Sequence, residues 1–456
     1  MSDLPISAEL PEPLDQCPHY LRAVTQLGDG REVVARADIA ALDGTKLLAR
    51  GASVDSSKFE VLSQHKLAML LDVVLTAANA VDAKQLAFDA NKLIASDPFL
   101  AMLTGRSGDP LGFRQSLGAL TLPAAVAFRL TVMREAAPDL FQHALRVCLI
   151  TYALAMRMGL KGRMSDLLLA ALCHDIGELH TDPDLLAPGR RVTAEERHQF
   201  IHLHPVTGHA MLCHALGVPG AVLKAVLQHH ERMDGSGYPQ GLRGDEIHPF
   251  ARVLGVPEVT DVLARRADSQ RVDVLLRLNH QRFDARVIDA LRELLRAVPA
   301  RTQSDAAAAL DTSSQLGQLA DMLVAGLELL ERLEAQGEPG VDLRFITERI
   351  SMLRGLMHNS GISSEYVAAL TDIAREDHEV ANELAATVDE LNWLMEDIAN
   401  EIERRTVSLG GASAEIVGEL VALLRGHNSA DPVERASAGA ADAADPSVAE
   451  AAPAAT

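Results

Sequence analysis

The chain has 456 residues, a formal net charge of −21, 48% hydrophobic residues and only 3% aromatic residues. A chain of this length has room for two or three domains with cores of their own. The negative charge repels nucleic-acid phosphates and no run of Lys or Arg offsets it, which argues against a nucleic-acid-binding protein. Because Ala, Leu and Val dominate the apolar residues, we expect a mainly α-helical fold with little sheet.

Neither disulfides nor a membrane anchor is expected. The four cysteines, Cys17, Cys148, Cys173 and Cys213, show no CxxC spacing, which favours free thiols in a reducing compartment. The N-terminus lacks a basic region followed by an apolar run, so no signal peptide is predicted, and no apolar segment is long enough for a membrane span. A cytoplasmic location is therefore the prediction.

The first third of the chain predicts a leader, a small module and a connector. Residues 1–15 contain three prolines and are predicted to be a flexible leader. Residues 16–83 combine short β-like runs, the turn Asp43-Gly44 and a helix-like stretch over residues 56–65, which predicts a small α+β module. A packing role without a ligand stays open for this module, since no motif in it specifies chemistry. Residues 84–130 are predicted to be a helical connector.

Residues 131–300 read as helices joined by short loops. An apolar stripe at helical spacing predicts a helix from Pro138 to Met158, and a second helix over residues 164–173 ends directly before His174. A capping box at Thr193 predicts a helix running toward His204. A further helix is predicted over residues 221–230.

The C-terminal part has a different character. Residues 301–427 contain three apolar stripes at spacings of three and four on helices with charged outer faces. A helical bundle or antiparallel hairpin is the favoured interpretation, and a coiled-coil arm that forms a homodimer is the alternative. Residues 428–456 are rich in Ala, Asp, Pro and Ser and are predicted to be a disordered tail. The stripes are Leu316, Leu319, Leu323, Leu327 and Leu330; Leu343, Ile346, Ile350, Leu353 and Met357; and Val380, Leu384, Val388, Leu391, Met395, Ile398 and Ile402.

Histidines are concentrated in the 131–300 segment, and two adjacent pairs stand out. His174-Asp175 and His229-His230 each follow an apolar helix, where packing alone gives little reason for consecutive polar rings. A site of imidazoles and carboxylates without thiolates suits Fe, Mn or Zn, and a carboxylate can bridge two such ions. Two ions can acidify a bridging water and clamp the attacking and leaving oxygens of a phosphoester. The pattern therefore predicts a multinuclear hydrolytic centre.

The motifs around these pairs closely resemble those of the HD-GYP family, over about residues 131–300. The resemblance rests on residues 173–177 (CHDIG), 204–208 (HPVTG), 229–231 (HHE) and 234–239 (DGSGYP). Residues 239–247 and 282–284 add supporting matches, and residues 44–72 are weakly similar to an N-terminal extension found in some members.

This resemblance implies an all-helical HD-type domain that holds two or three divalent ions, Fe or Mn, and hydrolyses cyclic di-GMP to pGpG or GMP by attack of a metal-bridging hydroxide. His174 and Asp175 are the implied catalytic residues, and Asp175 is the implied bridge between metals. The implied substrate-binding residues are Gly237, Tyr238, Pro239 and, by charge, Arg243. The implied metal ligands are Asp139, His143, His174, Asp175, His204, His229, His230 and Glu258.

Three positions depart from the family pattern. Asp139 stands where a glutamate is usual, Glu258 stands where an aspartate is usual, and Glu178 replaces the lysine expected three residues after the HD aspartate. Glu178 reverses a charge that would face the substrate phosphate, and losing one such contact typically costs about 10²- to 10³-fold in rate. The sequence leaves open two alternatives, in which Glu178 turns to solvent without effect or itself binds a metal ion.

The sequence therefore leaves three functions open. The first is a metal-dependent cyclic di-GMP phosphodiesterase. The second is a catalytically weak or inactive signalling adaptor that binds cyclic di-GMP or partner proteins. The third is an HD phosphohydrolase that acts on a different nucleotide.

Overall fold

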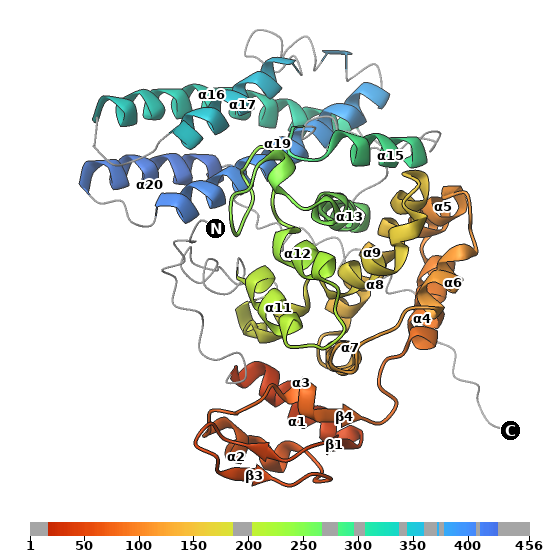
Figure 1. The fold of residues 1–456 in the computed structure, drawn as a ribbon. Coiled ribbons are helices and arrows are strands. Elements are labelled where there is room, and N and C mark those ends of the chain that lie inside the picture. Colours follow the sequence, from red (N-terminus) through yellow and green to blue (C-terminus); the bar gives the residue numbers. More distant parts are fainter. Residues whose placement is uncertain are drawn as a thin grey trace, which may run out of the picture. The chain divides into compact units, whose positions relative to one another are not determined.

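The computed structural model describes residues 17–185, 203–266, 281–295, 306–336, 344–359, 372–373, 378–406 and 411–426. These residues are mainly helical, with short strands near the N-terminus (Figure 1). They divide into two compact units: residues 1–183 with 195–299, and residues 184–194 with 300–456. The predicted leader, the predicted tail and the capping box at Thr193 lie outside the described residues.

The N-terminal module is α+β, as predicted. Two antiparallel strand pairs form its small sheets, and Val33 at the start of the first strand is fully buried. Its elements are α1 (Pro18–Gly30), β1 (Val33–Ala35), β2 (Ile39–Ala40), β3 (Lys46–Leu48), η2 (Ser56–Lys58), α2 (Phe59–Ser63), α3 (Leu71–Val74) and β4 (Leu75–Ala77). Strand β1 pairs with β4 and β2 pairs with β3. Because the sheets of the module have only two strands each, helix α1 supplies much of its core.

Capped helices follow the module. Asp82 caps the first of them by accepting a 2.7 Å hydrogen bond from the Gln85 backbone N–H, and Asp97 caps the next with a proline at its first turn. The elements are α4 (Ala83–Ser96), α5 (Pro98–Arg106), α6 (Gly112–Gly118) and α7 (Ala124–Ala136). They belong to the same core as both the module and the helices that follow. The segment expected to act as a connector is therefore integral to the packing of the first unit.

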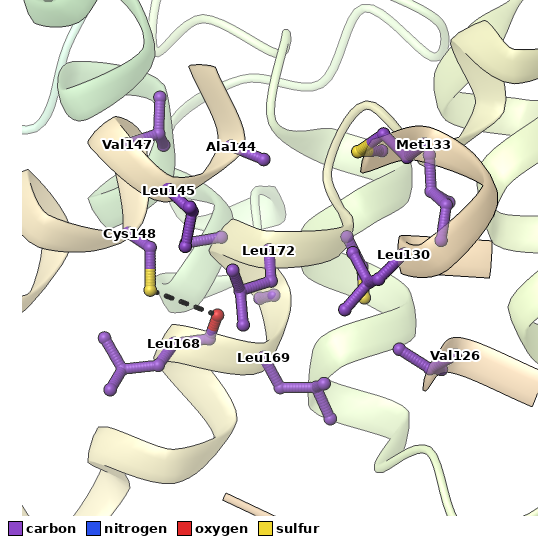
Figure 2. Close-up of a cluster of buried hydrophobic side chains, with 14 of the residues drawn as sticks. Val126, Leu130, Met133, Ala144, Leu145, Val147, Cys148, Leu168, Leu169 and Leu172 are labelled. Atoms are coloured by element: carbon purple, nitrogen blue, oxygen red, sulfur yellow. Dashed lines mark hydrogen bonds between the residues drawn. The ribbon is translucent and has the colours of Figure 1, made fainter. Parts of the chain in front are cut away.

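The core beside the future site is aliphatic. Figure 2 shows Val126 and Leu130 of α7, Leu145 of α8 (Pro138–Arg157) and Leu172 of α9 (Met164–Cys173) in one cluster of buried side chains. Burial of each leucine of this kind contributes about 1.5–3 kcal/mol. Helices α8 and α9 have the bounds that their stripes predict, to within one residue. The packing of these two helices fixes the backbone of His143, which lies on α8, and of His174, which directly follows α9.

The remaining elements of the first unit surround α8 and α9. His204 begins helix α11, with Pro205 in its first turn. The helix predicted from Thr193 toward His204 lies outside the described residues. His229 directly follows the last residue of its helix. The elements are η3 (Lys161–Arg163), η4 (Ile176–His180), α11 (His204–Cys213), α12 (Gly220–Gln228), η7 (Gly244–Glu246), α13 (Pro249–Arg266) and α15 (Ala285–Leu295), and η5 (Pro183–Leu185) spans the boundary between the two units.

The second unit is a helical bundle, as favoured by its stripes. Its helices are α16 (Ala306–Gln336), α17 (Arg344–Asn359), α19 (His378–Thr406) and α20 (Gly411–Arg425), and they share one apolar core. Arg349 and Glu401 form an ion pair of 2.9 Å inside it, with both side chains 5% exposed. Leu343 and Val380 of the predicted stripes lie outside the described side chains. The other stripe residues face this core, which favours the bundle over the coiled-coil arm.

The described helices include none with the length and apolar character needed to cross a bilayer. The four cysteines are free thiols, as predicted.

Candidate metal centre

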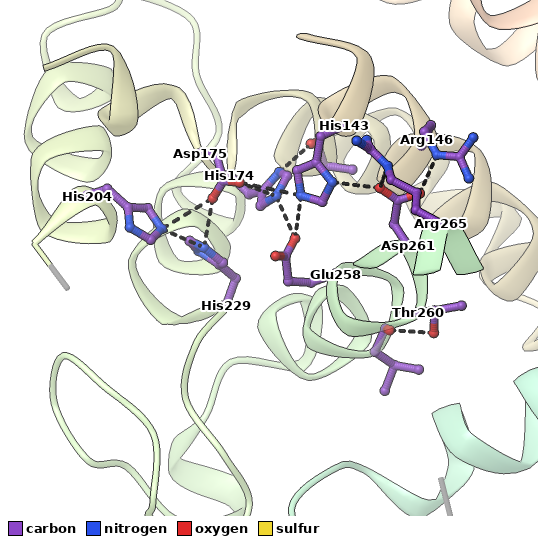
Figure 3. A network of polar contacts seen from close by, with 12 residues as sticks. His143, Arg146, His174, Asp175, His204, His229, Glu258, Thr260, Asp261 and Arg265 are labelled. Atoms are coloured by element: carbon purple, nitrogen blue, oxygen red, sulfur yellow. Dashed lines mark hydrogen bonds and ion pairs between the residues drawn. The ribbon is translucent and has the colours of Figure 1, made fainter. Parts of the chain in front are cut away.

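The predicted ligands converge from five parts of the chain (Figure 3). Among the described residues, two groups of side chains have ligand atoms within 4.8 Å of one another: Asp175, His204, His229 and His230; and His143, His174, Asp175 and Glu258. Asp175 belongs to both groups. Asp139, whose side chain is exposed in the first turn of α8, belongs to neither group. Binding of metal by these residues remains a prediction.

The group built on α8, α9 and α13 centres on Glu258. Its Oε2 atom lies 2.9 Å from His143 Nε2 and 2.8 Å from His174 Nε2. Asp175 Oδ2 lies 3.0 Å from His174 Nε2 and 3.5 Å from His143 Nε2. Ligands bound to one ion at about 2.1 Å stand roughly 3.0 to 3.4 Å apart. The spacing here matches that of a ligand set.

The group built on α11 and the end of α12 centres on the other oxygen of Asp175. Asp175 Oδ1 lies 3.2 Å from His204 Nε2 and 3.3 Å from His229 Nε2, and these two nitrogens lie 3.2 Å apart. The ring of His230 lies 4.1 Å from that of His229, between centroids, and stacks on Tyr238 at 4.6 Å. The two Asp175 oxygens therefore face different groups, as in a bridging carboxylate.

The ring nitrogens are oriented for a cation. His174 Nδ1 lies 2.8 Å from the Ala171 carbonyl and His229 Nδ1 lies 2.7 Å from the Val226 carbonyl, and a carbonyl can only accept. Each Nδ1 is therefore the donor, and in the neutral ring each Nε2 presents a lone pair to the carboxylates. Among the described residues, none donates a hydrogen bond to the buried Asp175 Oδ1. Facing lone pairs require a cation between them, either a proton or a metal ion.

The two groups differ in which cation suits them. Burial lowers the pKa of His143, but the charge of Glu258 and hydrogen bonds to Asp261 and Glu258 outweigh it and raise the pKa to about 10. Burial lowers the pKa of His229 to about 4 and holds the pKa of His230 well below its ordinary value. At neutral pH, a proton on His143 can thus supply the cation that the Glu258 group requires. His229 and His230 stay unprotonated at neutral pH, so the donor set around them fits a metal ion.

Asp261 is a functional candidate that the sequence reasoning missed. Its Oδ2 atom accepts a 2.7 Å hydrogen bond from His143 Nδ1, which fixes the ring with Nε2 toward Glu258. Asp261 also pairs with Arg146 and, at 2.9 Å, with Arg265. A carboxylate on the far nitrogen raises the basicity of an imidazole ligand. The available signal was its position three residues after Glu258, on the same face of α13.

Glu178 is close enough to the predicted ligands for their charges to act on its carboxyl group. Burial, and after it the negative charge of Asp175, raises the pKa of the Glu178 carboxyl to about 7. The charges of His204, His143 and Glu258 also act on it. The substitution of glutamate for lysine therefore changes the charge at the site itself, not that of a distant solvated position.

The GYP turn is held by Glu231, for which the sequence suggested no role. The Glu231 carboxylate accepts hydrogen bonds from the backbone N–H groups of Gln240, at 2.6 Å, and Leu242, at 2.9 Å. Gly237 is required by close packing, since a Cβ there would lie 2.3 Å from the His230 carbonyl oxygen. Tyr238 and the adjoining Pro239 thus lie beside the His230 ring. The exposed Arg243 lies over Gly235 of the turn, outside both groups of possible ligands.

His204→Gln should remove about half of the bound metal, because it takes a donor from one group and leaves the other intact. Metal content of the purified protein, measured by mass spectrometry, tests this expectation. His209→Gln is the matched control, being the same change on the same helix outside both groups. Equal metal content in the two variants would contradict the predicted role of His204.

Metal affinity should rise with pH between 6 and 9. In the metal-free protein, the pKa of His143 of about 10 means that an entering ion must displace a proton. Each proton released gives roughly a tenfold gain in affinity per pH unit below that pKa. Titration of Mn²⁺ at several pH values measures the slope. Asp261→Asn should flatten it, since that change lowers the pKa of His143, and a slope of zero in the unaltered protein would refute the expectation.

Comparison with known proteins gives independent information about the family of this chain. Residues 133–287 match the family model of the HD domain. Over 196 residues the chain is 30% identical to 3'3'-cGAMP-specific phosphodiesterase 1 of Vibrio cholerae, covering 39% of this chain and 43% of that protein. It is 36% identical over 125 residues to a cyclic di-GMP phosphodiesterase of Pseudomonas aeruginosa, covering 27% of this chain and 30% of that protein. The matches thus span less than half of these relatives.

Among solved structures, Bd1817, a HDG"Y"P protein from Bdellovibrio bacteriovorus, matches with 16% identity and a TM-score of 0.32, covering 61% of this chain and 98% of that chain. This TM-score is too low to add to the fold described above. The family match and the curated relatives lead to one conclusion: residues 133–287 carry an HD domain similar to those of curated cyclic dinucleotide phosphodiesterases.

Proposed function

We propose that this protein is a metal-dependent phosphodiesterase of cyclic dinucleotides, with cyclic di-GMP as the first candidate substrate and pGpG or GMP as products. The observation that carries the proposal is Asp175, whose two oxygens face two separate groups of imidazole donors. The names of the relatives, which include cyclic di-GMP and 3'3'-cGAMP phosphodiesterases, support the substrate class.

The residues around the centre would have different roles in the reaction. Divalent ions bound there, Fe or Mn, would supply Lewis acidity at the phosphoryl oxygens and an acidified water. Asp175 would hold the two groups at a fixed separation, and Asp261 would fix the ring of His143. Glu231 would hold the turn that carries Gly237, Tyr238 and Pro239 against the His230 side of the site. Arg243 would offer its charge to a substrate phosphate from the same turn.

A catalytically weak adaptor that binds cyclic di-GMP or partner proteins is the second candidate. Glu178 favours it, since an anion close to the predicted ligands repels a phosphate diester. Against it stands the convergence of buried imidazoles and carboxylates, which is costly to keep without a cation. Metal content separates the two candidates, because fewer than one ion per chain in the protein as purified favours the adaptor.

The protein loaded with Mn²⁺ or Fe²⁺ under reducing conditions should hydrolyse cyclic di-GMP, with products identified by chromatography. Replacing both His174 and Asp175 by alanine should abolish turnover, since it removes donors from both groups. Circular dichroism of this variant should remain helical. Hydrolysis of 3'3'-cGAMP and of linear nucleotides in parallel defines the substrate class. Absence of turnover by protein with measured bound metal would refute the phosphodiesterase.

Glu178→Lys should raise kcat/KM by about 10²-fold, because it replaces a repelling charge with one that attracts the substrate phosphate. Glu178→Gln, which removes the charge with little change of shape, should give an intermediate value. Metal content measured on both variants detects a different role: if Glu178 is itself a ligand, both variants lose metal and activity together.

We further propose a cytoplasmic location, supported by the free thiols. A homodimer through the C-terminal helices, or a signalling partner bound there, also remains a proposal. Since the described stripe residues face the bundle core, such a contact would use the outer faces of α16 to α20.

A further inference from the structure

A cluster of side chains outside the two groups of possible ligands joins the N-terminal module to η4, the turn that follows His174 and Asp175. His180, the last residue of η4, stacks on Tyr20 of α1, with ring centroids 4.6 Å apart and planes 21° apart. The Cys17 thiol lies 3.0 Å from the carbonyl oxygen of His180. A side chain and the backbone of the same residue are thus both held by the start of the module.

Arg129 of α7 completes the cluster. Its side chain is 2% exposed, pairs with Asp72 of the module at 2.6 Å and lies over the ring of Tyr20 at 5.1 Å. Its Nη1 atom lies 2.7 Å from the sulfur of Met211, which is on α11 two turns after His204. One buried guanidinium therefore contacts both the module and the helix that carries a predicted ligand.

His180 stays neutral in this setting. Burial, reinforced by the charge of Arg129, holds the pKa of His180 well below its ordinary value. In the described part of the chain, no group hydrogen-bonds to its buried Nε2 atom. The ring thus contributes stacking area and shape at this position instead of charge.

The position of the turn η4 is linked to the positions of two predicted ligands, Asp175 and His204. It begins after Asp175 and packs on the first turn of α11 through Gly177, where an added Cβ would lie 2.1 Å from the His204 carbonyl oxygen and 2.8 Å from the Gly208 nitrogen. Contact this close leaves little space between the two backbones. A shift of η4 must therefore move either Asp175 or the backbone of His204.

We propose that the N-terminal module is a structural part of the metal centre, and that Tyr20, through its stack on His180, is a positioning residue for the group formed by Asp175, His204, His229 and His230. The inference rests on the proposed function in that it takes this group to bind metal. It gives the module a role that needs no ligand of its own. The predicted result of loosening the stack is weaker metal binding at this group, with the Glu258 group little affected.

The test compares Tyr20→Ala with Tyr20→Phe in the full chain. Loss of the ring should weaken Co²⁺ or Mn²⁺ binding at one of two sites by about tenfold and change the visible spectrum of the Co²⁺-loaded protein, as expected when the support of a ligand is removed. Tyr20→Phe keeps the ring and should restore both the affinity and the spectrum. His180→Ala removes the same stack from the other side and should reproduce Tyr20→Ala, which covers the case that Tyr20→Ala does not fold.

Leu62→Ala controls for general loss of stability. Leu62 is a 1% exposed core residue of the same module, on α2, which packs on α1. This change should lower the unfolding temperature and leave metal affinity and the Co²⁺ spectrum unaltered. The proposal is overturned if Tyr20→Ala and His180→Ala bind metal as the unaltered protein does, or if Leu62→Ala weakens binding equally. Both readouts are independent of turnover, so an inactive but metal-binding protein would refute the proposed function and leave this inference standing.

Discussion

The first unit depends on one electrostatic constraint: lone pairs of imidazoles and carboxylates converge in a space from which water is largely excluded. His174 and His229 cannot turn away, because their Nδ1 atoms donate to backbone carbonyls. Asp175 cannot turn away, because each of its oxygens faces a different group. Such an arrangement is stable only with cations between the donors. The acidic pKa values of His229 and His230 make metal ions more suitable than protons for one of the two groups.

The scaffold meets this constraint with rigid, well-packed elements. Helices α8 and α9 share an aliphatic core, so His143 and His174 start from fixed backbones. The turn η4 is held on one side by α11 and on the other by α1. Arg129 buries a charge between these parts and is neutralised by Asp72. Buried pairs of this kind add little net stability, but breaking one is costly, which fixes the relative positions of the parts.

Glu178 is where the family pattern and this chain diverge. The family pattern has a lysine at this position, whereas the carboxyl found here has a pKa raised to about 7 by burial and by Asp175. In the proposed phosphodiesterase, Glu178 would either slow hydrolysis or provide an extra oxygen donor to a metal. Both roles follow from the same geometry, and they differ in whether removing the carboxyl costs bound metal.

The sequence alone determined the helices and the candidate ligands. Apolar periodicity defines α8 and α9, and the candidate ligands follow from the resemblance of the HD, HHE and GYP motifs, each contiguous in the chain, to a known family. The tertiary structure alone decided which candidates meet. It left Asp139 exposed at the start of α8, brought Asp261 into contact with His143, and placed Glu178 where the charges of the predicted ligands act on it. It also joined Tyr20 to His180 across 160 residues of chain. Such contacts depend on how separate helices pack, and no pattern within a single segment encodes that packing.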